Sequence, residues 1–211
     1  FLSDFEKQLF VHIPALESTI AIALKEIDEI TKQIETPTFR NTLETLQEIG
    51  TLVGRNSNLL FNLNSAETNK ELQKVAKDAA PLLTRFQNDI ILNEMLFKRI
   101  SYLYKNEVKD SLTPEQFTLL EKEYKTFVRN GAHLNDDAKN KLRILDTELA
   151  QLSLCFGENV LADTQEYSLH IKNESELKGL PDNVVETAKD IAQEKGKKGW
   201  LFTLDYPSYI P

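Results

Sequence analysis

The sequence has 211 residues, of which 41% are hydrophobic and 27% are charged, and its formal net charge is −8. This length is enough to bury a core, and the balance of apolar and charged residues is typical of a globular protein and excludes a compositionally disordered chain. The acidic residues are spread through every segment, which disfavours nucleic acid as a partner because phosphate backbones bind to basic surfaces.

No apolar stretch reaches the roughly 20 residues that a transmembrane helix needs, so no membrane partner is expected. Cys155 is the single cysteine. It cannot form an intrachain disulfide, and a cytoplasmic location is therefore the default. The sequence starts at Phe1 rather than at Met, and we expect both of its ends to be internal boundaries. A periplasmic location stays open, because a signal peptide could precede residue 1.

The first predicted helix follows Pro14, and Pro37 is expected to end it. Its apolar residues recur at steps of four and three, which is typical of one face of an amphipathic helix. They are Leu16, Ile20, Ala23, Ile27, Ile30 and Ile34. A second helical pattern begins at Phe39 and continues to Leu60. Gly50 and Gly54 share one face of it, where we expect a neighbouring backbone to approach closely.

Capping motifs predict where the next three helices begin. Thr68 followed by Glu71 has the form of a capping box, and Asn93 is a candidate N-cap. Thr113 opens the clearest box, with proline next and Gln116 closing it. The inward residues of these helices are expected to be Leu72, Val75, Ala79, Leu82, Phe86, Leu96, Phe97, Ile100, Leu103, Tyr104, Phe117, Leu120, Tyr124 and Phe127. Pro81 should kink or restart the first of the three helices, and Gly131 should end the last.

Asn135 is expected to cap a longer helix that reaches about Asp163. Its apolar residues lie in heptad-like register and predict a core stripe, and Cys155 beside them is read as a small core residue. The stripe consists of Leu142, Leu145, Leu149, Leu152 and Phe156.

Beyond this helix the hydrophobic period changes to two, which predicts a half-buried strand. Its inward residues are expected to be Tyr167, Leu169 and Ile171. A helix from about 181 to 195 and a second strand from 200 to 204 follow, and the two strands should pair. The predicted fold is mainly α, an antiparallel helical domain over residues 1–211, with helices over about 15–164 and a strand-helix-strand element over about 166–205.

Isolated polar residues give no convincing catalytic site. His12, His133 and His170 each lack a second histidine at metal-binding spacing, and His133 with Asp137 straddles a predicted helix start, where aspartate is already explained by the helix dipole. His12 and His170 are interpreted as surface histidines. There is no glycine-rich phosphate loop and no Gly-x-Ser-x-Gly elbow. The remaining candidates are attributed to capping, solvation or packing: Asp136, Asp137, Glu174, Glu176, Trp200, Tyr206 and Tyr209. We assign no catalytic, cofactor-binding or metal-binding residue.

Several segments, in order, resemble the N-terminal half of the thimet oligopeptidase, oligopeptidase A and peptidyl-dipeptidase family. The resemblance covers almost the whole chain. Its strongest segments are residues 37–42 (PTFRNT), 60–69 (LFNLNSAETN) and 127–132 (FVRNGA). Further matches follow in order, at residues 141–142, 152–153, 156–161 (FGENVL), 179–181 and 200–209 (WLFTLDYPSY).

The resemblance implies a cytoplasmic or periplasmic peptidase for short peptides. In that family one zinc ion is held by a His-Glu-x-x-His helix and a further Glu, inside a channel between two largely helical halves. No residue here matches that motif, which belongs to the C-terminal catalytic part. We therefore expect this chain alone to be inactive, and its principal partner to be that missing part.

The subtype stays open between two activities. The first expectation is a peptidyl-dipeptidase, which removes C-terminal dipeptides from short peptides. The alternatives are part of an oligopeptidase A-type endopeptidase or a non-catalytic helical binding module.

Overall fold

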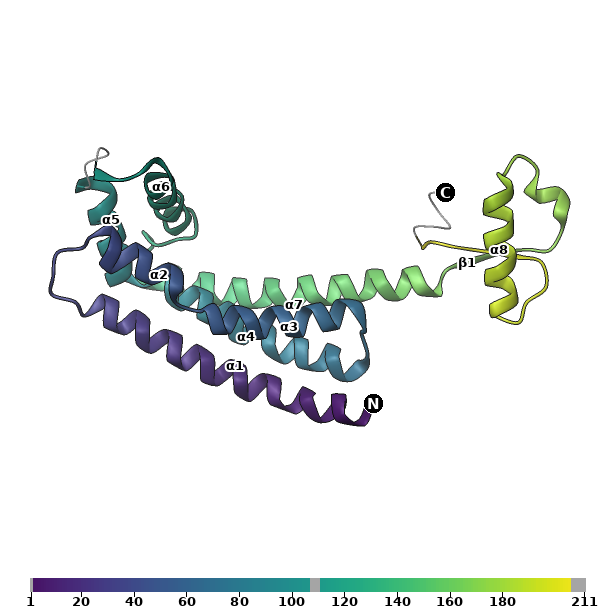
Figure 1. Cartoon of the computed structure of the whole chain (residues 1–211), viewed down its shortest axis with the longest axis horizontal. Helices are drawn as coiled ribbons and strands as arrows, with labels where there is room; N and C mark the ends of the chain where they lie inside the picture. Colours follow the sequence, from purple (N-terminus) through teal and green to yellow (C-terminus); the bar gives the residue numbers. More distant parts are fainter. Residues whose placement is uncertain (1, 107–110, 206–211) are drawn as a thin grey trace. The chain divides into compact units, whose positions relative to one another are not determined.

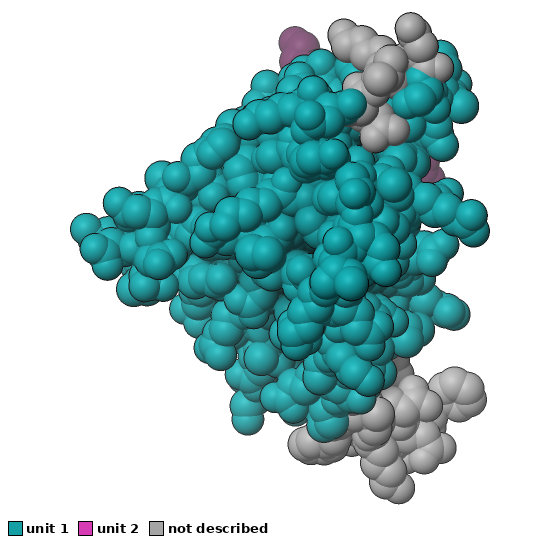
Figure 2. Space-filling model, turned by 90° about the vertical axis from the view of Figure 1, so that its left-hand side faces the viewer, with its two compact units in different colours: residues 1–151 teal, residues 152–211 magenta. Residues whose placement is uncertain are grey.

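The computed structural model of the chain describes residues 2–106 and 111–205. It confirms a mainly helical fold with two antiparallel strands near the C-terminal end. The chain divides into two compact units, Phe1–Gln151 (teal in Figure 2) and Leu152–Pro211.

The first unit is a layered arrangement of helices. Helix α1 packs against α3 and α4, and α5 packs against α6 (Figure 1). The bounds are α1 Leu2–Thr31, the π-helix η1 Phe39–Glu44, α2 Thr45–Glu48, α3 Thr51–Ala66, α4 Lys70–Ile91, α5 Glu94–Asn106 and α6 Pro114–Arg129. The next helix, α7 (Asp136–Glu166), begins in the first unit and ends in the second.

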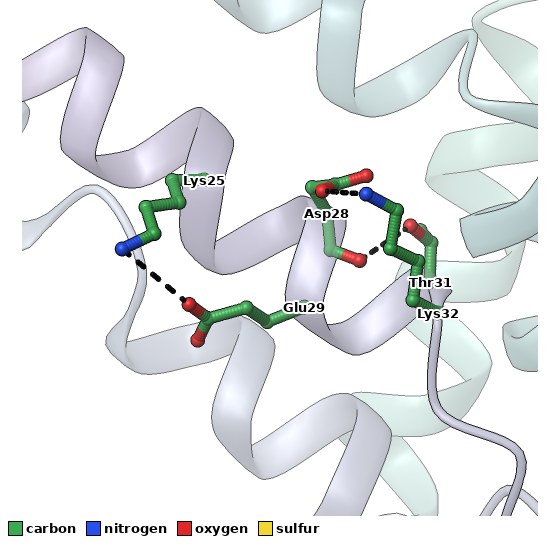
Figure 3. A network of polar contacts seen from close by, with 5 residues as sticks. All are labelled: Lys25, Asp28, Glu29, Thr31 and Lys32. Carbon is green, nitrogen blue, oxygen red and sulfur yellow. Dashed lines mark hydrogen bonds and ion pairs between the residues drawn. The ribbon is translucent and has the colours of Figure 1, made fainter.

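The predicted inward stripe of α1 is largely correct. Leu16, Ala23, Ile27 and Ile30 are buried in two core clusters shared with the neighbouring helices. The outer face is solvated and carries i, i+4 ion pairs, in which Lys25 approaches Glu29 and Lys32 approaches Asp28 (Figure 3). Because both pairs are exposed, they contribute little to stability.

Two details of the α1 prediction are wrong. The helix does not start after Pro14, which lies inside it, because a proline can remove one helical hydrogen bond without ending the helix. His12 is therefore a helical residue rather than one that precedes a helix. At the other end the helix stops at Thr31, so Ile34 falls beyond it and is almost fully exposed.

The predicted continuous helix from Phe39 is wrong, because three pieces replace it. Thr38 caps η1 in a reciprocal box with Asn41. The backbone turns extended at Ile49, and Gly50 adopts a φ of 81°, which favours glycine, before α3 begins. The predicted close backbone approach is also wrong. A Cβ on Gly50 would meet only the ring of Phe86 at 3.5 Å, and one on Gly54 would meet nothing within 4 Å.

The inward residues predicted for α4 to α6 are buried or half-buried. Asn93 caps α5 as predicted, its Oδ1 accepting from the Leu96 N–H at 2.9 Å. The α4 cap is Asn69 rather than Thr68, since Asn69 Oδ1 accepts from the Leu72 N–H at 2.8 Å. That helix runs through Pro81 to Ile91 without a restart.

The capping box of α6 is confirmed, and its contribution to stability can be measured. Thr113 Oγ1 accepts from the Gln116 N–H at 3.3 Å, and Gln116 Oε1 accepts from the Thr113 N–H at 3.0 Å. Thr113→Ala should lower the free energy of unfolding by about 1 kcal/mol in urea denaturation. The matched control is Thr118→Ala, inside the same helix and exposed, which should be neutral or slightly stabilising because alanine is the better helix former. Equal losses for both variants would contradict the capping role.

A buried cation orders the segment between α1 and η1. Arg99 on α5 is 6% exposed, and its guanidinium donates to the side chains of Gln33 (2.9 Å), Asn41 (3.1 Å) and Thr42 (3.2 Å). It also donates to the backbone carbonyls of Gln33 (3.2 Å) and Glu35 (3.4 Å). Burial lowers the pKa of Arg99, and the ring of acceptors offsets the cost of removing its charge from water.

A second buried cation donates a hydrogen bond at the C-terminal end of α4. Lys139, near the start of α7, donates from its Nζ to the carbonyl oxygen of Leu92 at 3.1 Å. A positive charge there complements the negative end of the helix dipole.

The second unit contains the end of α7 and a small strand-helix-strand element. Its elements are β1 Ser168–Ile171, the 3₁₀ helix η3 Glu174–Leu177, α8 Asp182–Glu194 and β2 Trp200–Thr203. The strands pair antiparallel, with His170 opposite Leu201, and α8 packs on β2.

The predicted inward face of β1 is wrong. Leu201 is fully buried, and the register places Ser168 and His170 on its face of the sheet. Leu169 therefore lies on the opposite face, where it is 50% exposed, and Tyr167 before it is equally exposed. The alternation of residues along β1 was predicted correctly, but the covered face is the one that carries Ser168 and His170, not the one that carries Leu169.

Candidate functional site

Among the described residues, α7 carries an exposed apolar stripe. Leu145, Leu149, Leu152 and Phe156 are 60%, 62%, 59% and 71% exposed. We call these four residues the α7 stripe. The prediction that they form a core stripe is wrong for this chain, although Leu142 before them is half-buried against a core cluster. Cys155, predicted to be a core residue, is exposed as well.

The spacing explains why the sequence misleads here. Steps of four, three and four place all four residues of the stripe along one face of the helix. Such a pattern indicates that a face is suited to a partner, but it does not say which chain supplies the partner. Apolar side chains exposed together in this way form a candidate contact surface.

The second unit exposes a smaller apolar face. Leu169 pairs with Phe202 and Ile171 with Trp200 in the sheet, so these four side chains share the face opposite Leu201. They range from half-buried to exposed. This face is a second candidate contact surface.

The first unit also contains a cavity of about 1030 Å³ between α3, α4 and the turn that leads into α7. Val53, Phe86 and Ile90 contribute apolar walls, while Arg129 and Asp146 bring charges of opposite sign to its lining. Asn88, also in the lining, is only 6% exposed, and its Nδ2 has no hydrogen-bond partner among the described residues.

The three histidines lie on separate elements. His12 on α1 is half-buried, and burial lowers its pKa. His133 is exposed, with its ring edge-on to that of Phe97 at a centroid distance of 4.7 Å. His170 on β1 is half-buried, and its Nε2 lies 2.7 Å from the carbonyl oxygen of Lys198. The surface interpretation of His12 and His170 is therefore only partly correct.

The carboxylates considered from the sequence are explained by local structure. Asp136 and Asp137 lie exposed in the first turn of α7, and Asn135 caps that helix, with its Oδ1 accepting from the Ala138 N–H at 2.9 Å. Glu174 and Glu176 are exposed on η3. Trp200 is half-buried on β2, whereas Tyr206 and Tyr209 lie outside the described residues.

The described residues do not fit a zinc ion. Within residues 2–106 and 111–205, no three side chains of His, Cys, Asp or Glu come together in a way that could hold a metal. We therefore derive no metal-dependent step for this chain.

In the same two ranges, no helix is long and apolar enough to cross a membrane.

Comparison with known proteins identifies relatives along almost the entire chain. No family model matches the sequence. The chain is 31% identical to dipeptidyl carboxypeptidase of Escherichia coli over 192 residues, which are 90% of this chain and 28% of that protein. It is 26% identical over all 211 residues to oligopeptidase A of the same bacterium, covering 31% of it. A thimet-like oligopeptidase of Dictyostelium discoideum is 28% identical over 93% of this chain and 28% of its own length.

The chain thus spans less than a third of the length of these relatives. Their names agree with the resemblance drawn from residues 37–42, 60–69 and 127–132. Along nearly all of its length, the chain is homologous to an N-terminal part of the dipeptidyl carboxypeptidases and oligopeptidases A, peptidases of the thimet oligopeptidase family.

Proposed function

We propose that this chain is the non-catalytic part of a zinc-dependent oligopeptidase and forms one wall of its substrate channel. The observation that carries the proposal is the α7 stripe, an exposed apolar helix face on a chain that matches under a third of the length of its relatives. The remainder of the protein would cover the stripe and hold the zinc ion.

Burial of the stripe supplies a physical reason for assembly. Complete burial of one leucine or phenylalanine side chain is worth about 1.5–3 kcal/mol relative to exposure. Each side chain of the α7 stripe leaves more than half of its surface exposed, so a partner surface gains much of this free energy. The uncovered sheet face beside Leu169 adds further apolar area.

A wall made of packed helices suits the activity that the relatives' names indicate. Peptidases for short peptides must exclude folded proteins, and rigid walls around a narrow channel do so by size. We propose peptidyl-dipeptidase activity for the assembled protein, in the cytoplasm, with short peptides as substrates. Metal-assisted hydrolysis would take place in the part that carries the zinc ligands.

Separating the natural protein into two polypeptides tests the proposal. One polypeptide is this chain and the other is the remaining part. We expect each to be inactive alone toward short quenched-fluorescent peptides, and the mixture to show cleavage that a chelator abolishes. A double variant, Leu149→Glu with Phe156→Glu, should weaken assembly in the mixture by about tenfold or more, because it places two charges in an apolar contact.

The control for this test is Glu148→Lys, at an exposed polar position next to the stripe. It should assemble within about twofold of the parent, as a peripheral charge does. Chelator-sensitive cleavage by this chain alone would overturn the non-catalytic assignment. Assembly unaffected by the double variant would show that the stripe is not the contact surface.

A further inference from the structure

We propose that the cavity between α3, α4 and the turn before α7 is a binding site for an uncharged, apolar peptide segment. The cavity lies entirely within the first unit and is distinct from the α7 stripe, which begins at Leu145. The choice of a peptide as the ligand class rests on the proposed function. The shape and chemistry of the site come from the cavity itself.

The size and walls of the cavity fit apolar side chains. Its volume of about 1030 Å³ lies at the upper end of the range usual for small-molecule sites. Val53 and Phe86 in its walls are otherwise buried in the core, so these walls are held rigidly. Apolar side chains entering the cavity would therefore meet a preformed surface.

Asn88 gives the site a polar requirement. Its side chain is more than nine-tenths buried, and the amide nitrogen has no hydrogen-bond partner among the described residues. A buried donor without an acceptor costs free energy, which a ligand can recover by supplying a carbonyl oxygen. Asn88 is among the residues that line the cavity, so a ligand bound there would lie next to this amide.

An amide side chain has the same hydrogen-bonding groups as a peptide unit. The Nδ2–H of Asn88 would donate to a peptide carbonyl, and its Oδ1 would accept from a peptide N–H. A hydrocarbon would fill the apolar space but would leave the donor unsatisfied. Arg129 and Asp146 carry opposite charges in the lining, which favours a segment without net charge over an anion or a cation.

The glycine at position 54 makes the site testable. Gly54 lines the cavity from within α3, and a Cβ built there meets no atom within 4 Å. A leucine at this position should therefore occupy the open space without disturbing the fold. Gly157 on α7 has equally open surroundings and does not line the cavity, so Gly157→Leu is a matched control.

The experiment is a titration of the isotope-labelled chain, followed by nuclear magnetic resonance at the Asn88 side-chain amide. The probe is N-acetyl-leucyl-leucine N-methylamide, and the glycyl-glycine analogue is the comparison ligand. We expect saturable shifts with the leucine probe and a dissociation constant weaker by about tenfold or more for the glycine analogue.

The variants decide between binding and a purely structural role for Asn88. Gly54→Leu and Asn88→Leu should each weaken probe binding by about tenfold or more, while Gly157→Leu binds as the parent does. The unfolding midpoint should not fall in either cavity variant, because Gly54→Leu removes a helical glycine and Asn88→Leu removes an unpaired buried donor.

Three results would contradict the proposed binding site. The first is the absence of saturable shifts at Asn88, and the second is undiminished binding by Gly54→Leu. The third is a lower unfolding midpoint for Asn88→Leu, which would mean that the amide already has a hydrogen-bond partner in the folded chain. None of these affects the assembly test above, which alters the α7 stripe and not the cavity. Failure of the peptide site and failure of the proposed function are thus distinguishable.

Discussion

Replacing Arg99 with methionine should lower the free energy of unfolding of this chain by about 2–4 kcal/mol. Methionine retains an apolar stem of similar length but donates no hydrogen bonds. Acceptors on Gln33, Glu35, Asn41 and Thr42 then lose their donor, some of them in a part-buried setting. Urea denaturation followed by far-ultraviolet circular dichroism measures the loss.

The neighbouring cation is the control for Arg99. Lys98 is exposed and pairs with Glu94 in the preceding turn of α5, so Lys98→Met should leave the unfolding midpoint unchanged. A second measurement locates the effect. Amide hydrogen exchange in residues 32–38 should accelerate in Arg99→Met and not in Lys98→Met, because Arg99 holds that segment by its carbonyl groups. Unchanged stability and exchange in Arg99→Met would contradict the proposed ordering role.

Leu96→Ala should cost about 2–5 kcal/mol, whereas Leu149→Ala should cost about 0.5 kcal/mol or less. Leu96 is fully buried in the cluster that joins α1, α4, α5 and α6, and truncating it leaves a cavity. Leu149 is 62% exposed and loses few contacts. Denaturant midpoints of the two variants, measured side by side, provide the comparison.

This pair of variants reverses what the heptad register of residues 142–156 predicts. Equal losses for Leu96→Ala and Leu149→Ala would mean that the α7 stripe is covered within the chain. In the assembled protein, by contrast, Leu149→Ala should weaken the contact with the remaining part, so its effect depends on whether that part is present.

Local rules predicted the starts of α5, α6 and α7 correctly. Caps at Asn93, Thr113 and Asn135 depend on a side chain and a backbone N–H three residues later, so the sequence contains the complete interaction. Errors arose where a distant contact or a single backbone torsion determines the local structure. Gly50 precedes α3 with a positive φ that separates this helix from α2, and no periodicity predicts this torsion.

Burial was harder to predict than secondary structure. Apolar spacing identifies which residues share a face, but the cover of that face depends on tertiary arrangement, as α7 and β1 both show. Arg99 could have been noticed, because it lies between Leu96 and Leu103 at helical spacing, where a charge on an apolar face requires acceptors.

The cavity could not have been predicted from the sequence. Asn88 becomes significant only because α3 and the turn before α7 surround it, and no local motif encodes that arrangement. The absence of a sequence motif at Asn88 therefore did not indicate the absence of a site. The His-Glu-x-x-His motif differs in this respect, because its two histidines lie on one face of a single helix and can be recognised from the sequence alone.

Cys155 gives the molecule a built-in reporter. It is the single cysteine of the chain, and it is exposed on α7, where it shares a shallow surface depression with Leu152 and Phe156. A maleimide dye would consequently attach at one known point without any engineered mutation. The rate of labelling should then measure how often this part of the helix is uncovered. A time course of thiol protection would therefore follow assembly at this one position of α7, rather than through the activity that assembly produces.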